Sequence, residues 1–181
     1  MREAEGTGCA MATLADHIRD IQDFPKQGVL FKDITTLLKD AGAFRRSLDA
    51  LEGRCRDYGA TKVVGIESRG FIFAAPLADR LGAGLVPVRK LGRLPAETVR
   101  AEYALEYGTN TVEMHRDAIV PGERVLIVDD LLATGGTCRA AIGLVEQVGG
   151  LVVGCAFLAE LGFLEGRATL AGYAVEALIT Y

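Results

Sequence analysis

The sequence lacks tryptophan, has only two histidines, and contains no apolar run as long as a membrane span. About 18 consecutive apolar residues are needed to cross a bilayer, so we expect no membrane partner. The first twenty residues include acidic side chains and no apolar core, which is unlike a signal peptide. These absences favour a cytoplasmic protein.

Cysteine is also sparse. The four cysteines, Cys9, Cys55, Cys138 and Cys155, are widely separated, and no CxxC pair occurs. With so few histidines, a cluster of Cys and His metal ligands is not expected. We expect reduced thiols that are mostly buried as small apolar side chains, as is typical of cytosolic proteins.

An excess of positive charge is missing too. The chain has 20 Lys and Arg against 24 Asp and Glu, for a net charge of -4. This balance does not suggest a nucleic-acid partner. With 181 residues, of which 50% are hydrophobic and 24% charged, the composition is that of one globular domain. We expect a frayed extension at residues 1–12 and a single domain at 13–181.

Continuous apolar runs alternate with helical periodicities from about residue 44 onward. Such runs predict buried strands, and the alternation indicates an α/β fold, a Rossmann-like twisted and mainly parallel sheet flanked by helices. Ligands of such sheets lie outside the carboxyl ends of the strands. The expected strands cover residues 61–67, 84–88, 123–130, 151–160 and 173–181, and the expected helices cover 44–55, 71–81 and 141–148. In the second helix, Phe71, Ala75, Ala78 and Leu81 are the expected buried face.

Two further segments lie outside this alternation. Leu14, Ile18 and Ile21 recur at helical spacing, and Thr13 is a suitable N-cap, which predicts a helix at residues 13–21. Residues 29–40 read as a short extended piece followed by a turn of helix. The segment from Lys90 to Tyr107 is polar and interrupted by Gly and Pro, which is typical of a functional or mobile loop.

The stretch VLIVDDLLATGGT, residues 125–137, is the most informative in the sequence. A central strand over 125–128 would bring Asp129 and Asp130 to the ligand-binding edge of the sheet. The turn that follows exposes backbone N–H groups at the positive end of the next helix, where a phosphate binds. Neighbouring carboxylates accept hydrogen bonds from sugar hydroxyls or hold Mg²⁺ through water. This combination suits a ribose 5-phosphate.

Other phosphate-binding motifs do not fit this stretch. No Gly-Lys-Ser/Thr follows, so it is not a Walker A loop, and the dinucleotide pattern G-x-G-x-x-G is absent. A solvated acidic turn followed by an ordinary helix start is the structural alternative. The full run of apolar residues, two acids and A-T-G-G-T is more specific than that alternative requires.

Residues 125–137 resemble the phosphoribosyl-diphosphate (PRPP) binding motif of type I phosphoribosyltransferases. Four other segments resemble the adenine phosphoribosyltransferases of this family, in the same order along the chain: DFPKQGVLFKDIT, VVGIESRGFIFAAPLA, VPVRKLGRLP and YALEYGTNTVEMH. The resemblance covers roughly residues 14 to 160. It implies the type I phosphoribosyltransferase fold, with a small N-terminal hood at residues 13–40 and a mobile catalytic loop at 90–110.

The resemblance implies a purine-salvage reaction in which adenine and PRPP give AMP and pyrophosphate. Mg²⁺ is the implied cofactor, held by PRPP and waters near Asp129 and Asp130 rather than by the protein directly. A homodimer is implied as well. The segment around Arg89, Lys90 and Arg93 is often used across the dimer interface in this family.

The resemblance also assigns site residues. Glu106 is the implied acid/base for adenine, and Tyr107 helps to cover the site. The Glu67–Ser68 peptide is expected to be cis. The remaining assignments are ribose and 5-phosphate binding by Asp129, Asp130, Ala133, Thr134, Gly135, Gly136 and Thr137, pyrophosphate binding by Ser68, Arg69, Arg89, Lys90 and Arg93, and base binding by Leu30, Phe31 and Lys32.

Three alternatives remain at this point. One is a phosphoribosyltransferase for another base, such as xanthine or a pyrimidine. The second is a non-catalytic PRPP-binding regulator that binds nucleic acid, although the chain has no room for a helix-turn-helix before the first element and its net charge is negative. The third is a ribose-phosphate binding module, against which the SRGF and LEYG segments argue.

Overall fold

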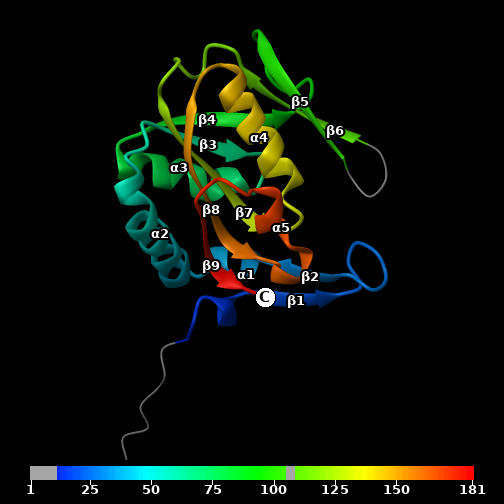
Figure 1. Ribbon diagram of the computed structural model, residues 1–181. Coiled ribbons are helices and arrows are strands. Elements are labelled where there is room, and N and C mark those ends of the chain that lie inside the picture. Colours follow the sequence, from blue (N-terminus) through cyan, green and yellow to red (C-terminus); the bar gives the residue numbers. More distant parts are fainter. Residues whose placement is uncertain (1–11, 105–108) are drawn as a thin grey trace, which may run out of the picture. The chain divides into compact units, whose positions relative to one another are not determined.

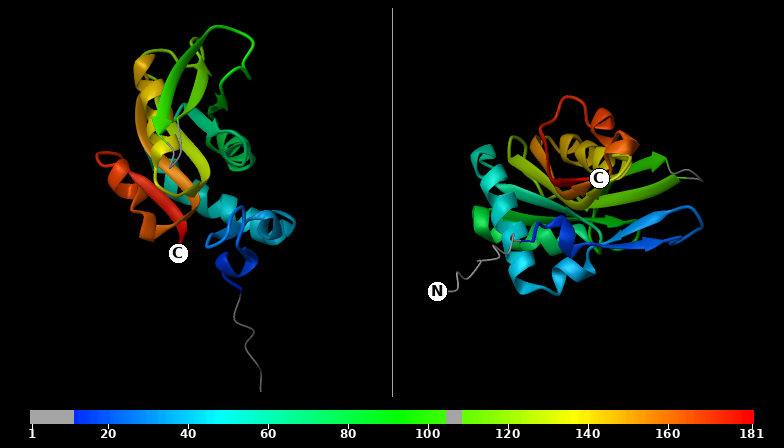
Figure 2. Two further views of the ribbon diagram at one scale, coloured as in Figure 1. Left: turned by 90° about the vertical axis from the view of Figure 1, so that its right-hand side faces the viewer. Right: turned by 90° about the horizontal axis from the view of Figure 1, so that it is seen from below.

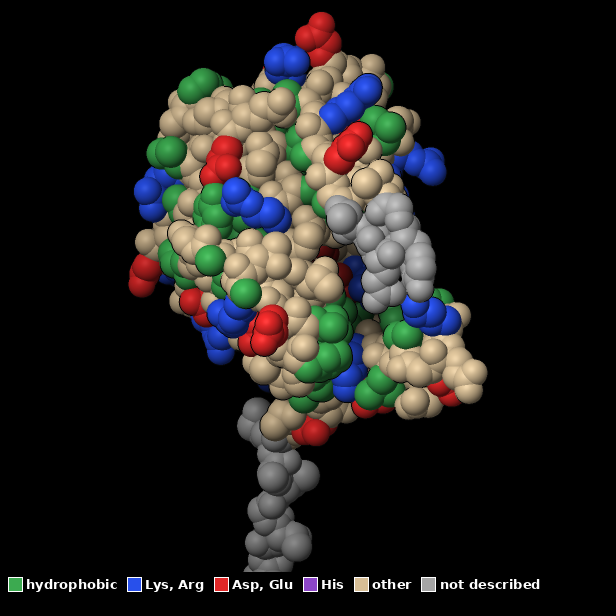
Figure 3. All heavy atoms as spheres, turned by 45° about the vertical axis from the view of Figure 1, so that its right-hand side comes forward, with side chains coloured by type: hydrophobic (Ala, Val, Ile, Leu, Met, Phe, Trp, Pro, Cys, Tyr) green, Lys and Arg blue, Asp and Glu red, His purple; other side chains and the backbone are tan. Residues whose placement is uncertain are grey.

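The computed structural model describes residues 12–104 and 109–181 (Figure 1). The chain divides into two compact units, residues 1–46 and residues 47–181. No helix in the described ranges is both long and apolar enough to span a membrane. On the face drawn in Figure 3, basic and acidic side chains are interspersed, as expected from the nearly balanced composition.

The first unit contains a two-stranded antiparallel sheet and short helices. A 3-10 turn, η1 (Ala15–His17), precedes strands β1 (Arg19–Gln22) and β2 (Leu30–Asp33) and helix α1 (Thr35–Leu38). Helix α2 (Ala41–Cys55) begins in this unit. The extended piece followed by a helical turn, predicted for residues 29–40, is confirmed.

The predicted helix at residues 13–21 is wrong. After η1 the chain turns extended at Ile18, and Arg19 pairs with Asp33 in the register of β1 and β2. A helix of about nine residues is marginal in water, so distant strand pairing outweighs local periodicity. Thr13 does not cap a helix; its N–H and hydroxyl both donate to Asp16 Oδ2, at 2.7 and 2.8 Å.

Asp33 links β2 to α1. Its Oδ1 accepts hydrogen bonds from the hydroxyl and the backbone N–H of Thr35, at 2.7 and 2.9 Å, and its Oδ2 lies 2.5 Å from Arg19 Nη2. These donors, the Thr35 hydroxyl foremost and then Arg19, lower the pKa of Asp33 to about 2. The ionised carboxylate therefore fixes the start of α1 against the hairpin.

The second unit is built on a seven-stranded sheet with the order β5-β6-β4-β3-β7-β8-β9. Strands β4, β3, β7, β8 and β9 run parallel, and β6 is antiparallel to both β4 and β5. The predicted mainly parallel α/β fold is confirmed. The strands are β3 (Lys62–Ile66), β4 (Gly84–Lys90), β5 (Thr98–Ala104), β6 (Thr109–His115), β7 (Arg124–Leu132), β8 (Leu151–Glu160) and β9 (Val175–Thr180).

Helices cover both faces of this sheet (Figures 1 and 2). Helix α4 (Gly136–Gln147) packs on one face and α3 (Gly70–Leu81) on the other. Successive strand residues point to opposite faces, so in β7 Val125 and Ile127 belong to the core under α4 while Leu126 and Val128 point to the other side. This two-sided burial explains why the strands read as continuous apolar runs.

The helix predicted at residues 71–81 is present as α3, but its buried face differs from the predicted one. Ala78 is buried as predicted, but Phe71 and Leu81 are only half-buried and Ala75 is exposed. The other buried side chains are Phe73, Ala74 and Leu77. Because α3 has apolar residues on several sides, helical periodicity alone does not determine which side is buried, and the predicted side is adjacent to the buried one. The helix predicted at 141–148 corresponds to the second half of α4, where Ala141, Leu144 and Val145 are buried and Val148, just after the helix, is half-buried.

Strand β5 lies in the segment from Lys90 to Tyr107 that was expected to be a polar loop, and it forms a hairpin with β6. The buried side chain of Glu113, on β6, accepts the hydrogen bonds that fix this region; it is 1% exposed. One carboxylate oxygen accepts hydrogen bonds from the backbone N–H groups of Arg93 and Leu94, at 2.9 and 3.1 Å, and the other accepts from the Thr98 hydroxyl at 3.3 Å. Although burial acts in the opposite direction, the N–H groups of Leu94 and Arg93 lower the pKa of Glu113. A buried charge thus holds the turn between β4 and β5.

The cysteine prediction is confirmed for the described residues. Cys55, Cys138 and Cys155 are buried and free. Burial raises the pKa of the Cys55 thiol to about 12, which keeps it unreactive at neutral pH. Cys9 lies outside the described residues.

Candidate active site

The two adjacent carboxylates lie on the last residues of β7. The pairing of β7 with β3 ends at Val128 opposite Gly65, while its pairing with β8 continues to Leu132. Asp129 and Asp130 therefore lie on the part of β7 that extends past its pairing with β3. This is the carboxyl end of the parallel strands, where the sequence pattern predicts a ligand.

Asp130 provides a buried acceptor. It is 3% exposed, and its Oδ2 lies 3.0 Å from Nε of Arg69. The contact is electrostatic, because Oδ2 has no hydrogen-bond partner among the described residues. Burial raises the pKa of Asp130, and the Arg69 guanidinium opposes that effect. A sugar hydroxyl or a metal-bound water would satisfy this oxygen.

Asp129 is held against the first turn of α3. Its Oδ1 accepts a hydrogen bond from the backbone N–H of Asp130 at 2.9 Å. A Cβ added to Gly70 would lie 2.7 Å from the same oxygen, so only glycine leaves room for the carboxylate here. Burial and the neighbouring charge of Asp130 raise the pKa of Asp129 well above its ordinary range. This role of Gly70 was not predicted from the sequence.

A cup of backbone follows β7. Residues 133–137 line a small pocket of about 70 Å³, together with Asp129 and Phe157. Gly135 has a φ of +84°, a conformation that favours glycine, and the 12-residue helix α4 begins at Gly136. N–H groups at a helix start attract anions through the helix dipole. Six of the seven residues predicted for ribose and 5-phosphate binding therefore line this pocket, and the seventh, Asp130, lines the pocket next to it.

A wider pocket of about 360 Å³ adjoins this cup. It shares Asp129, Leu131, Ala133 and Thr137 with the first pocket, so the two form one continuous lining. The wider pocket is lined further by Ile66, Glu67, Ser68, Arg69, Lys90, Tyr103 and Asp130. Cationic groups therefore face the same space as the two carboxylates.

The five residues predicted to bind pyrophosphate divide into two sets. Ser68, Arg69 and Lys90 line the wider pocket, and Arg89 and Arg93 do not. Arg89 Nη1 instead donates to the backbone carbonyl of Arg93 at 3.2 Å, which holds the strand against the turn that follows it.

Glu67 organises this side of the pocket and was not predicted to belong to the site. Its Oε2 accepts hydrogen bonds from the backbone N–H of Lys90 at 3.0 Å and from Arg89 Nε at 3.2 Å. Although burial acts in the opposite direction, these donors lower the pKa of Glu67. The Glu67–Ser68 peptide is cis, as the family resemblance implied.

Tyr103 is a second pocket residue that the sequence analysis missed. It lies on β5, is half-buried, and lines the wider pocket together with Lys90. Its strand alternates polar residues with Val99, Ala101 and Tyr103, which pack against the core under α4. This period of two was the available signal for a strand.

The residues predicted to bind the base lie in the first unit. Leu30, Phe31 and Lys32 are on β2, where Phe31 packs edge-on against Phe24 with ring centroids 5.1 Å apart. Because Leu30 and Lys32 are two residues apart, their backbone groups point to the same side of the strand. Glu106 and Tyr107 lie outside the described residues, and their roles stay predictions.

A parallel sheet that ends in two adjacent carboxylates, beside a backbone cup at a helix start, is the arrangement expected of a phosphoribosyltransferase. The family model described as "Phosphoribosyl transferase domain" matches residues 35–169. The adenine phosphoribosyltransferase of Thermobifida fusca is 58% identical over 171 residues, which is 94% of this chain and 97% of that protein.

Solved structures agree with this assignment. Adenine phosphoribosyltransferase from Thermoanaerobacter pseudethanolicus has a TM-score of 0.91 at 53% identity, covering 93% of this chain and 100% of that one. The Saccharomyces cerevisiae enzyme, in complex with an imino-altritol bisphosphate and adenine, has a TM-score of 0.87 at 39% identity, covering 91% and 96%. The chain belongs to the adenine phosphoribosyltransferase family.

Proposed function

We propose that this protein transfers the 5-phosphoribosyl group of PRPP to adenine, giving AMP and pyrophosphate, with Mg²⁺ as cofactor and as a homodimer in the cytoplasm. The observation that carries the proposal is the continuity of the backbone cup at residues 133–137 with the pocket that holds Asp129, Asp130 and Arg69. PRPP carries two anionic groups, a 5-phosphate and a pyrophosphate, and the site has two connected pockets. Its 5-phosphate suits the cup and its pyrophosphate suits the wider pocket.

The sugar is oriented between these two anionic ends. With the 5-phosphate on the amides of the cup, the ribose hydroxyls face Asp129 and Asp130. Burial raises the pKa of both carboxyls, so their ionised forms need hydrogen-bond donors or cations nearby. Hydrogen bonds from two sugar hydroxyls meet that need, so substrate binding favours the ionised pair.

Pyrophosphate departure requires positive charge at the wider pocket. Arg69, just before α3, and Lys90, at the end of β4, both line this pocket and can supply that charge. The Arg69 guanidinium is held by the Asp130 carboxylate, and the Lys90 backbone is held by Glu67. The Arg69 cation is thus oriented before substrate arrives, and such preorganisation is what makes electrostatic stabilisation effective.

The donor set fits Mg²⁺. No group of three or more His, Cys, Asp or Glu suited to a metal occurs in the described part of the chain, whereas Asp130 offers a buried carboxylate oxygen without a hydrogen-bond partner there. Mg²⁺ keeps several waters and is bound through one or two carboxylates and substrate phosphates. When bound, it neutralises charge on the departing pyrophosphate. Asp129 and Asp130 would hold it through water.

Adenine recognition is proposed for the backbone of β2. Leu30 and Lys32 present their N–H and C=O groups on one side of a strand that pairs only with β1 among the described residues. The structure of the S. cerevisiae relative contains adenine, which supports this choice of base. Glu106 is proposed to handle the proton that adenine exchanges during attack.

The proposed dimer rests on exposed apolar side chains of the second unit. Ile72 on α3, Leu85 on β4 and Leu91 just after β4 are 38%, 45% and 50% exposed. Large apolar side chains on neighbouring elements are typical of protein interfaces. Light scattering after size-exclusion chromatography should give twice the chain mass of 19.3 kDa. A monomer mass at all concentrations would contradict this part.

The experiment for the reaction is a panel of bases with PRPP and Mg²⁺, followed by pyrophosphate release. Adenine should be turned over far faster than hypoxanthine, guanine, xanthine or uracil. Preference for any of these other bases would overturn the adenine assignment. If no base in the panel, adenine included, led to release of pyrophosphate, the proposed transfer would be overturned.

A further inference from the structure

The rear of the phosphate cup rests on a segment that neither the sequence motif nor the proposed mechanism uses. After β8, the chain forms a 3-10 turn, η3 (Gly162–Leu164), and the single-turn helix α5 (Gly166–Thr169). Two residues of α5 meet the backbone of the cup directly. Thr169 Oγ1 donates a hydrogen bond of 2.8 Å to the carbonyl of Thr134.

Gly166 makes the second contact, by close approach of two backbones. A Cβ added to Gly166 would lie 2.2 Å from the carbonyl oxygen of Ala133, far inside van der Waals contact. The approach is mutual, since a Cβ on Gly135 would lie 2.7 Å from the carbonyl oxygen of Gly166. Glycine is therefore required on both sides of this contact.

These rear contacts determine the direction in which the cup's amides point. In a trans peptide the C=O and the following N–H lie in one plane and point in opposite directions. Holding the Thr134 carbonyl at the rear therefore aims the Gly135 N–H away from α5. The Ala133 carbonyl, which lies against Gly166, aims the Thr134 N–H in the same way. Neither amide donates to a backbone carbonyl in the described part of the chain, so both are available for an anion.

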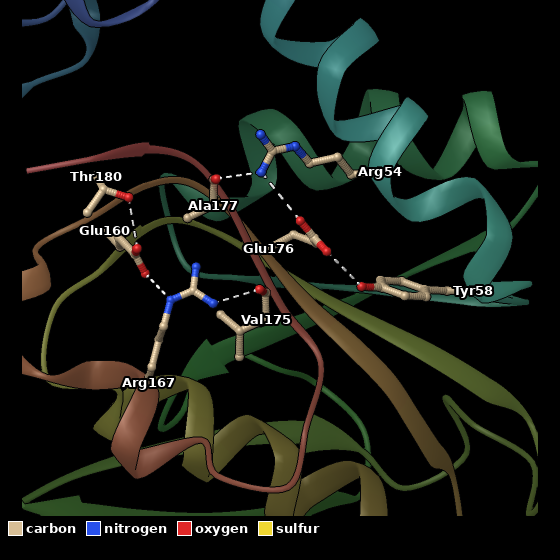
Figure 4. A network of polar contacts seen from close by, with 8 residues as sticks. All are labelled: Arg54, Tyr58, Glu160, Arg167, Val175, Glu176, Ala177 and Thr180. Atoms are coloured by element: carbon tan, nitrogen blue, oxygen red, sulfur yellow. Dashed lines mark hydrogen bonds and ion pairs between the residues drawn. The ribbon is translucent and has the colours of Figure 1, made fainter.

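Helix α5 is itself anchored to the sheet (Figure 4). Arg167 Nε donates to Glu160 Oε2 at 2.6 Å, and its Nη1 donates to the carbonyl of Val175 at 2.8 Å. The other oxygen of Glu160 accepts from the Thr180 hydroxyl at 2.9 Å. Glu160 is the last residue of β8 and Thr180 is the last residue of β9. Two neighbouring strands therefore hold α5, the helix that contacts the backbone of the cup.

We propose that Thr169 and Gly166 are positioning residues for the 5-phosphate: they fix the Thr134 and Gly135 amides in the direction that binds it, without touching the substrate. This inference rests on the proposed function and deepens it. It implies that binding of the 5-phosphate depends on α5, whereas binding of pyrophosphate is independent of α5.

The test compares two ligands on one set of variants. Thr169→Val removes the hydroxyl at nearly constant shape, and Thr169→Ser retains it. Binding of ribose 5-phosphate and of magnesium pyrophosphate is measured by calorimetry on the full-length protein. We expect Thr169→Val to weaken ribose 5-phosphate binding about fivefold to tenfold, the effect of losing one well-placed hydrogen bond. Pyrophosphate binding should stay unchanged, and Thr169→Ser should bind ribose 5-phosphate within about twofold of the parent.

Thr61→Val is the matched control. The Thr61 hydroxyl also donates to a backbone carbonyl, that of Arg124 at 3.3 Å, but at the amino end of β3 and β7. It should leave binding of both ligands unchanged. Gly166→Ala is a second perturbation of the cup and should weaken ribose 5-phosphate binding more than Thr169→Val does.

Three results would overturn the inference: unchanged ribose 5-phosphate binding in Thr169→Val, an equal loss of pyrophosphate binding, or failure of Thr169→Ser to restore binding. Ribose 5-phosphate carries no base, so an error in the proposed adenine specificity would appear in the base panel and leave this comparison intact. If the parent protein bound pyrophosphate but not ribose 5-phosphate, the assignment of the cup and this inference would both fail.

Discussion

Replacing Gly70 with alanine should damage stability and substrate binding together. The added Cβ would lie 2.7 Å from Asp129 Oδ1 and 2.9 Å from the carbonyl oxygen of Val128, inside the 3.4 Å at which ordinary contact begins. The Val128 carbonyl belongs to β7, which is paired on both sides and cannot retreat. Either the first turn of α3 shifts, or Asp129 rotates out of place.

The magnitude follows from the packing. Inserting one methyl group into a tightly packed contact costs about 1–3 kcal/mol. If Asp129 moves, part of that cost appears in ligand affinity, where about 1.4 kcal/mol corresponds to a tenfold change. We therefore expect Gly70→Ala to unfold at lower urea concentration and to bind ribose 5-phosphate about tenfold more weakly. Because the chain has no tryptophan, circular dichroism is the suitable probe of unfolding.

Gly143→Ala provides the control. Gly143 lies within α4, and a Cβ there would meet nothing within 4 Å. Alanine should therefore stabilise the protein by about 0.5–1 kcal/mol and leave binding unchanged, because glycine is unfavourable inside a helix. The reasoning is refuted if Gly70→Ala matches the parent in both unfolding and binding, or if both glycine variants respond alike.

The remaining predictions concern three carboxylates. The raised pKa of Asp129 means that the folded state holds a proton more tightly than the unfolded state, so this group's contribution to stability falls as pH rises above about 4. Asp129→Asn should melt above the parent at pH 8, by a margin that shrinks toward pH 5 in calorimetry, while losing PRPP binding. For Asp33 the pH dependence of stability is opposite. Its pKa of about 2 means that its contribution to stability is present above pH 3.8 and is lost as pH falls through about 2. Asp33→Asn should thus be less stable than the parent at pH 7 in urea titrations, and the difference should narrow at pH 3. Glu113→Ala should lose about 1–3 kcal/mol, because the N–H groups of Arg93 and Leu94 lose their acceptor, and Glu113→Gln should lose less. Equal urea midpoints for these two Glu113 variants would contradict that account.

The centre of the sheet was predictable because sequence and structure depend there on the same property. Strands β3, β7 and β8 are buried on both faces, and an apolar run is the direct result of that burial. The cup was predictable for a related reason. A helix start that binds an anion requires glycine and small hydroxyl residues in consecutive positions, so the signal is local.

What the sequence did not reveal depends on partners distant in the chain. Arg19 lies in a strand only because Asp33 and its neighbours pair with it. Gly70 and Gly166 appear as ordinary helix residues until another backbone or carboxylate is placed within 3 Å of them. Tyr103 lines the pocket because β5 pairs with β6 at the sheet edge, a pairing that the short alternating pattern of β5 does not reveal by itself.

The most direct test of this account is a crystal structure of the protein with AMP bound. We expect the phosphate oxygens to lie within hydrogen-bonding distance of the backbone N–H groups of residues 133–137, with the ribose hydroxyls against Asp129 and Asp130. A nucleotide whose phosphate lay elsewhere, with the cup filled by water, would contradict the central claim.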